Sequence, residues 1–116
     1  DDNYLRGAAA KCLGEIGGAN AVKPLIALFD DDNGAVRQEA VRALGFIGVD
    51  AVKPLLDRLK DPSPAFQRCV VQALKEIRDP AVGDALKSLA SDMDIPAALR
   101  WEAKLAVNRL REQPQR

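Results

Sequence analysis

Few side chains in this sequence could carry out catalysis. The chain has no histidine, which is the commonest general base and the commonest metal ligand. The serines, Ser63, Ser88 and Ser91, have no candidate base at a recognisable spacing. We therefore predict that the protein is not an enzyme and that it uses no metal or other cofactor.

Two cysteines and a run of aspartates are the remaining candidates for chemistry. Cys12 and Cys69 match no metal or redox spacing, which favours two free thiols in an intracellular chain. By repeat alignment Cys12 takes a small core position and Cys69 an accessible one, but we do not expect a reactive thiol at Cys69, because Arg68 is the one evident cationic neighbour that could lower its pKa. The aspartates at 30–32 lack the further oxygen ligands of a calcium loop, and we expect them to form a capping turn.

The composition indicates one folded all-α domain. The 116 residues are 47% hydrophobic, 29% charged and only 4% aromatic, with alanine and leucine prominent. Seventeen basic residues balance 17 acidic ones, which disfavours nucleic acid and anionic membranes as partners. No apolar run is long enough to span a bilayer, so we expect a cytoplasmic location. Because the first residue is aspartate, we expect residues 1–116 to be a fragment of a longer chain.

A repeat of about 30 residues organises the whole sequence. The motif "LRGAAAKCLGEIG" from Leu5 returns as "VRQEAVRALGFIG" from Val36, as "FQRCVVQALKEIR" from Phe66 and as "LRWEAKLAVNRLR" from Leu99. A second motif alternates with it, as in "VDAVKPLLDRL" from Val49. We divide the chain into a partial unit at 1–18 and full units at 19–48, 49–78 and 79–112.

Each motif has the apolar spacing of one amphipathic helix. Val36, Ala40, Ala43, Leu44 and Ile47 form a single stripe at 3.6 residues per turn. The spacing predicts seven helices, near residues 3–16, 20–30, 34–47, 50–60, 64–77, 80–91 and 96–112.

Glycine, proline and polar residues mark where these helices should begin and end. Gly17 and Gly48 follow the last stripe residue, as a left-handed C-cap requires. Pro24 and Pro54 fall in a first helical turn. Backbone amides there have few or no hydrogen-bond partners within the helix, so the amide hydrogen that proline lacks is not missed. The next helix in each unit is expected to take its N-cap from Asn20, Asp50 or Asp79.

Residues 30–61, "DDDNGAVRQEAVRALGFIGVDAVKPLLDRLKD", resemble a HEAT repeat of the short bacterial type found in phycobilisome lyases. The resemblance covers nearly the whole chain. It implies a right-handed superhelix of antiparallel helix pairs, with the "VRxxA" helices lining the concave side. It also implies a ladder in which Arg6, Arg37 and Arg100 pair with turn aspartates such as Asp31 and Asp61.

The third copy of the motif departs from the pattern. Gln67 occupies the arginine position, and the two closing glycines become Lys75 and Arg78. These changes put the ladder and the tight turn in question at this repeat.

The exposed positions of the "VRxxA" helices form the candidate binding surface. Aromatic and arginine side chains usually contribute most of the binding free energy of an interface, and these helices carry several of them at such positions. Phe46 lies on the shoulder of its helix, and either partial burial against a neighbouring repeat or exposure fits its position. Trp101 serves either to cover the end of the stack or to contact a ligand. The candidate residues are Tyr4, Lys11, Gln38, Arg42, Phe46, Arg68, Gln72, Trp101, Leu105 and Arg109.

Three functions are consistent with these observations. The leading one is a non-catalytic module that binds a protein or peptide on its concave face, since the repeats are present and catalytic groups are few. The resemblance to phycobilisome lyases suggests bilin handling as an alternative. The third is nucleic-acid binding through Lys11, Arg42, Arg68 and Arg109, which should weaken steeply with salt.

Overall fold

The computed structural model describes residues 2–59, 63–77 and 79–112. Within these ranges the backbone forms seven α-helices and no strand, which confirms the all-α prediction. Short 3-10 turns, η1 (Ala19–Ala21), η2 (Leu28–Asp30) and η3 (Val49–Ala51), extend the second and fourth helices. The helices are α1 (Asp2–Ile16), α2 (Val22–Ala27), α3 (Gly34–Ile47), α4 (Val52–Arg58), α5 (Pro64–Glu76), α6 (Pro80–Ser91) and α7 (Ala97–Glu112).

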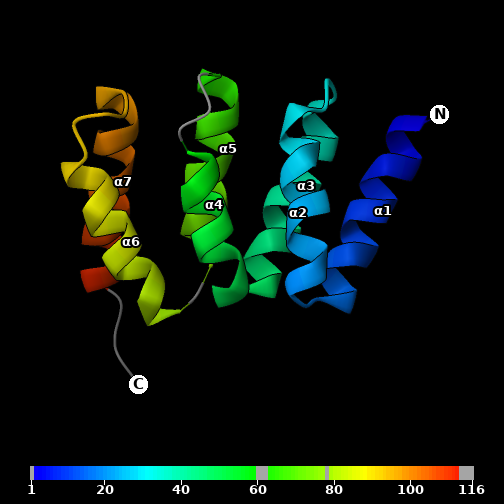
Figure 1. The fold of residues 1–116 in the computed structure, drawn as a ribbon, viewed down its shortest axis with the longest axis horizontal. Coiled ribbons are helices and arrows are strands. Elements are labelled where there is room, and N and C mark those ends of the chain that lie inside the picture. The colour runs from blue at the N-terminus through cyan, green and yellow to red at the C-terminus, as the bar shows by residue number, and fades with distance from the viewer. Residues whose placement is uncertain (1, 60–62, 78, 113–116) are drawn as a thin grey trace.

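The helices form two layers of a helical-repeat solenoid (Figure 1). Helices α1, α3, α5 and α7 lie side by side in chain order in one layer, and α2, α4 and α6 form the other. Helices of about this length are marginal alone in water, so each depends on burial against its neighbours.

The core lies between the layers and is built from the predicted stripes. Val36, Ala40, Ala43 and Leu44 of α3 are buried, and Ile47 is half-buried against them. Phe29 of η2 and Phe66 of α5 meet edge to face, with ring centroids 5.5 Å apart. This aromatic pair links the second repeat to the third.

The helix starts are capped partly by residues other than those predicted. Asp79 caps α6 as expected, its carboxylate accepting from the Ala81 amide. Asn33 caps α3 and Ser63 caps α5 in the same way. The prediction was wrong for Asn20 and Asp50, which lie inside η1 and η3 instead of before them.

Glycines with positive φ explain this shift of the helix starts. Gly17 and Gly48 have φ values of 75° and 89°, a region that other residues rarely adopt. The chain turns there and enters a 3-10 helix at once, which places the polar residue within the helix. Pro24 and Pro54 are the third residues of α2 and α4, near the predicted position in the first turn.

Two further glycines let neighbouring helices approach each other closely. A Cβ atom placed on Gly14 of α1 would lie 2.6 Å from the Ala43 Cβ atom and 2.8 Å from its Cα atom. A Cβ atom on Gly45 of α3 would lie 2.5 Å from the Glu76 Cβ atom. The contacts of α1 with α3 and of α3 with α5 therefore require the absence of a side chain at these positions.

Alanine at either contact glycine should destabilise the fold. Gly14→Ala and Gly45→Ala force backbone to shift, and we expect each to lower the free energy of unfolding by about 1–3 kcal/mol, the usual cost of overpacking. Urea unfolding followed by circular dichroism measures this loss.

Gly7→Ala is the matched control, because it also lies on α1 and its nearest neighbour would be Glu39 Cγ at 3.9 Å. The free energy of unfolding of that variant should stay unchanged or rise by up to about 1 kcal/mol, because alanine has a better helix propensity than glycine. Equal effects at all three glycines would contradict the close-contact explanation.

Candidate protein-binding face

Each helix of the α1, α3, α5 and α7 layer presents three equivalent side-chain positions that lie four residues apart. All are exposed or half-buried, whereas the stripes of α3, α5 and α7 are largely buried. Because the helices lie side by side, these positions belong to one layer of the stack. We call this surface the odd-helix face; its positions are 7, 11 and 15, then 38, 42 and 46, then 68, 72 and 76, and last 101, 105 and 109.

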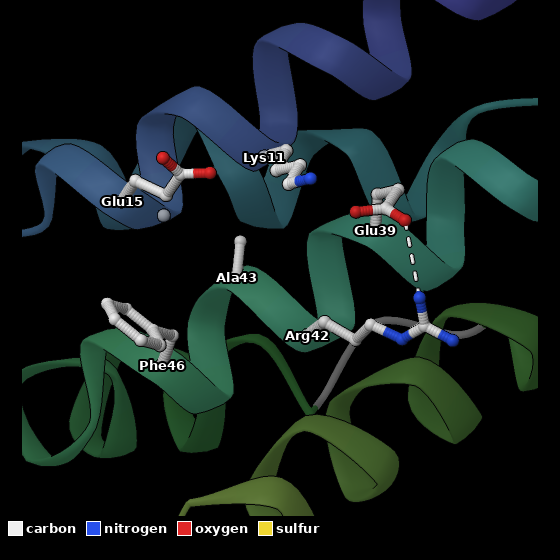
Figure 2. Close-up of a pocket in the computed structure, with 7 residues that line it drawn as sticks. Lys11, Glu15, Glu39, Arg42, Ala43 and Phe46 are labelled. Atoms are coloured by element: carbon white, nitrogen blue, oxygen red, sulfur yellow. Dashed lines mark hydrogen bonds and ion pairs between the residues drawn. The ribbon is translucent and has the colours of Figure 1, made fainter.

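A hollow of about 340 Å³ opens on this face between α1 and α3. Figure 2 shows Lys11 and Glu15 projecting from α1, opposite Glu39 and Phe46 of α3. The closely packed Gly14 and Ala43 lie among its lining residues, so its central part is apolar while its rim is charged.

The charges around this hollow are balanced. Arg42 donates to Glu39 at 3.4 Å, as the dashed line in Figure 2 marks, and Lys11 and Glu15 add one charge of each sign. A pair this exposed contributes little to stability. Its side chains can therefore exchange their contacts for those of a ligand at small cost.

Phe46 is exposed, with 75% of its surface accessible. Of the two possibilities that the sequence left open, partial burial against a neighbouring repeat is wrong. Gly14 brings α1 onto Ala43, and the hollow remains beside the ring where a larger residue of α1 could have covered it. Phe46 is therefore not part of the core, and its ring is accessible to another molecule.

The other predicted face residues are also accessible, but the structure does not gather all ten into one site. Lys11, Arg42 and Phe46 line the first hollow, and Gln38, Gln72 and Arg109 line a second one. The remaining four, which line neither hollow, are Tyr4 with 80% of its surface accessible, Trp101 with 59%, Leu105 and Arg68.

Two of these residues have particular surroundings. Gln38 of α3 donates to Gln72 of α5 at 3.4 Å, which links two neighbouring positions of the face. Trp101 of α7 is exposed, and residues 113–116, which follow this helix, lie outside the described residues.

Both cysteines are free thiols, as predicted, but the burial predicted for each of them was wrong. Cys12 is exposed, because the α1 stripe lies on the side of that helix that faces away from α3. Cys69 is buried, and this burial raises the pKa of its thiol despite the nearby charges of Arg37 and Arg68. A raised pKa lowers the thiolate fraction and makes Cys69 a poor nucleophile.

A charged cluster fixes the turn between η2 and α3 and ties it to α1. Arg6 makes two hydrogen bonds to Asp31, from Nε at 2.6 Å and from a terminal nitrogen at 3.1 Å. Asp31 also accepts from the Asn33 amide at 2.9 Å, and the exposed Asp32 lies 3.5 Å from Arg6. Arg6 contacts Asn3 as well. Hydrogen bonds from Arg6 first, and then from the Asn33 amide, hold the pKa of the Asp31 carboxyl below its usual value.

At the equivalent positions of later repeats, the side chain donates to a backbone carbonyl. Arg37 bonds to the Asp31 oxygen and Arg100 to the Ile95 oxygen, both at 2.6 Å. Gln67, which stands where the motif has arginine, bonds to the Leu59 oxygen at 3.0 Å. Asp61, the expected partner in the next rung of the ladder, lies outside the described residues.

The described residues contain no group of three or more His, Cys, Asp or Glu side chains that could hold a metal ion. None of the described helices is long and apolar enough to cross a bilayer.

Sequence reasoning did not find the second hollow. Its lining includes Lys75 and Lys87, which no motif marked as binding residues. The available signal was Lys75 itself, because it replaces the glycine of the two preceding repeats.

A stack of paired helices with this connectivity is an α-solenoid. A family model of HEAT repeats matches residues 1–58 and, in an overlapping match, residues 22–108. Together these matches span most of the chain, which therefore belongs to the HEAT-repeat family. No curated protein matches the sequence significantly.

The two phenylalanines on the layer of odd-numbered helices should differ sharply in their contribution to stability. Phe66→Ala removes a buried ring that packs on Phe29 and whose centroid lies 4.9 Å from the Arg58 guanidinium. We therefore expect its free energy of unfolding to fall by about 3–5 kcal/mol. Phe46→Ala removes an exposed ring and should cost about 0.5 kcal/mol or less. Thermal unfolding of both variants measures the difference, and a large loss for Phe46→Ala would show that the ring supports the fold.

The Asp31 cluster should make stability depend on pH. Because its pKa is lowered in the folded state, the ionised carboxylate stabilises the protein above the unfolded pKa of about 3.9, and this contribution is lost as pH falls through the folded value. Asp31→Asn should therefore lower the urea midpoint at pH 7, and its deficit should shrink on acidification below about pH 4.

Asp32→Asn is the control for this titration, because that side chain is 95% exposed. It should change the midpoint little at either pH. A deficit for Asp31→Asn that stays constant with pH would show that the carboxylate charge is not its source.

Proposed function

We propose that this chain is a non-catalytic interaction module whose odd-helix face binds a protein or peptide. The observation that carries the proposal is the exposed Phe46 beside the hollow between α1 and α3. Burying a large ring of this kind against a partner releases apolar surface from water, which is the main driving force of association.

Further features support a broad surface rather than a single pocket. Tyr4 and Trp101 expose large rings on α1 and α7, at the two ends of the layer. HEAT repeats commonly mediate protein–protein interaction or scaffolding, and this chain belongs to that family. A rigid stack presents such residues with little ordering cost on binding.

The alternatives have less support from the residues. Lys11, Arg42, Arg68 and Arg109 alternate with acidic side chains on the same helices, which disfavours nucleic acid. Bilin handling rests on the resemblance of the repeats alone, and pigment transfer on co-expression with a phycobiliprotein and a bilin would be needed to support it. We place the module in the cytoplasm as part of the proposal, consistent with its two free cysteines.

The proposal is tested by selecting binders from a displayed peptide library on the immobilised protein. Affinities are then compared on a variant in which Arg42, Phe46, Arg68 and Trp101 are all changed to alanine. We expect the selected peptides to lose at least about tenfold in affinity, because aromatic and arginine side chains are the usual hot spots.

A second quadruple variant controls for general surface changes. Lys23, Lys53, Asp57 and Asp84 are exposed on the α2, α4 and α6 layer, and their change to alanine should leave affinity unaltered. Circular dichroism checks that both variants fold. Equal binding by the wild type and the first variant would rule out the odd-helix face as the binding surface.

A further inference from the structure

The second hollow, a groove of about 820 Å³ between α5, α6 and α7, is larger than the one beside Phe46. It reaches Gln38 and Val41 of α3 at one side and the last turns of α7 at the other. Its volume lies in the upper part of the range of about 300–1,000 Å³ that is typical of ligand sites. None of the four residues substituted in the test above lines it.

The groove exists because one helix contact of the layer is not closed. Gly14 and Gly45 allow the contacts of α1 with α3 and of α3 with α5. Lys75 occupies the equivalent position of α5 and lines the groove. A lysine cannot be accommodated where even a Cβ atom would clash in the earlier repeats, and α7 accordingly packs over a much shorter stretch of α5.

Apolar side chains, which we call the floor, form part of the lining of the groove. Ile77 follows α5, Val82 and Leu86 come from α6, and Val107 and Leu110 come from α7. Leu110 is exposed, whereas the other four are buried beneath it. Apolar side chains of a ligand would therefore bury chiefly the exposed Leu110.

The rim carries cations from three helices. Lys75 of α5, Lys87 of α6 and Arg109 of α7 all line the groove, and none of them forms an ion pair with another residue that the structure describes. Of the two acidic lining residues, Asp79 is engaged as the N-cap of α6. Glu76 is the other, and the base of its side chain packs against Gly45 of α3.

We propose that this groove binds an acidic amphipathic helix of a protein partner. Apolar side chains at i, i+3, i+4 and i+7 would lie on the floor, and flanking carboxylates would face Lys75, Lys87 and Arg109. A basic helix would meet the three like charges of Lys75, Lys87 and Arg109, against two carboxylates, Glu76 and Asp79. This inference deepens the proposed function, since it adds a specific partner chemistry to an interaction module.

Two synthetic peptides test the charge complementarity. Each has about 15 residues, the length at which an isolated helix becomes marginally stable, and the same leucine positions. One carries glutamates on its flanks and the other lysines. We expect the acidic peptide to bind at least about tenfold more tightly by fluorescence anisotropy, with the preference weakening as salt rises.

A charge-reversal variant assigns the binding to the groove. Changing Lys75, Lys87 and Arg109 to glutamate should invert the preference between the two peptides. The control changes Lys23, Lys53 and Lys104 to glutamate, three exposed residues outside the groove that alter the net charge equally. This control should keep the preference for the acidic peptide.

Several results would overturn the proposal: no binding of the acidic peptide, equal binding of both peptides, or inversion by the control variant as well. The quadruple alanine variant separates this proposal from the broader one, because it should still bind the acidic peptide. If library peptides bind the odd-helix face while the acidic peptide does not bind, the groove proposal fails alone. If the acidic peptide binds the groove and the library yields no ligand that depends on Arg42, Phe46, Arg68 and Trp101, the role of the part of the odd-helix face around these four residues fails alone.

Discussion

The close approach of neighbouring helices at Gly14 and Gly45 is the constraint on which the rest of the structure depends. Helices of this length gain their stability from packing, and packing requires that α1, α3 and α5 approach to backbone contact. At 2.5 and 2.6 Å from the nearest Cβ atom, no side chain fits at either glycine. These two contacts set the spacing of the first three repeats, and with it the spacing of every side chain that the layer presents to solvent.

Close packing on one side of a helix leaves the opposite shoulder uncovered. Phe46 follows Gly45 directly, and the rotation of about 100° between successive residues takes its ring away from the contact that the glycine makes. Glu15 stands in the same relation to Gly14. The positions that follow the glycines therefore do not support the fold, which leaves them free to carry any side chain. This freedom explains how one of these two positions holds glutamate and the other phenylalanine.

The sequence predicted the helices well, because apolar spacing, glycines and prolines are local signals that repeat. The predicted ranges for α3 and α6 agree with the structure. Burial of single residues was harder to predict, because it depends on which neighbour is present. Cys12 aligns with the buried Ala43, yet it is exposed on the side of α1 that faces away from α3. Cys69 aligns with Glu39, yet it is buried where α5 packs differently from α3. The groove at Lys75 was not predicted for a related reason. Whether two helices pack closely depends on both of them, whereas the sequence of one repeat shows only that lysine replaces the glycine.

Lysine at position 75, in place of the glycine of the earlier repeats, weakens a helix contact but creates the proposed binding groove. Replacing the third contact glycine with Lys75 forgoes part of the burial that joins the other repeats. It also leaves an apolar groove between α5 and α7, with a positive charge at its edge. In a solenoid, each repeat contacts only its neighbours, so one weakened contact does not spread through the stack. The fold tolerates the open contact because the α6 and α7 pair packs closely within itself and α4 and α5 hold the repeat before it. Specificity in this molecule can therefore arise where the repeat pattern is interrupted, while the regular repeats maintain the frame around it.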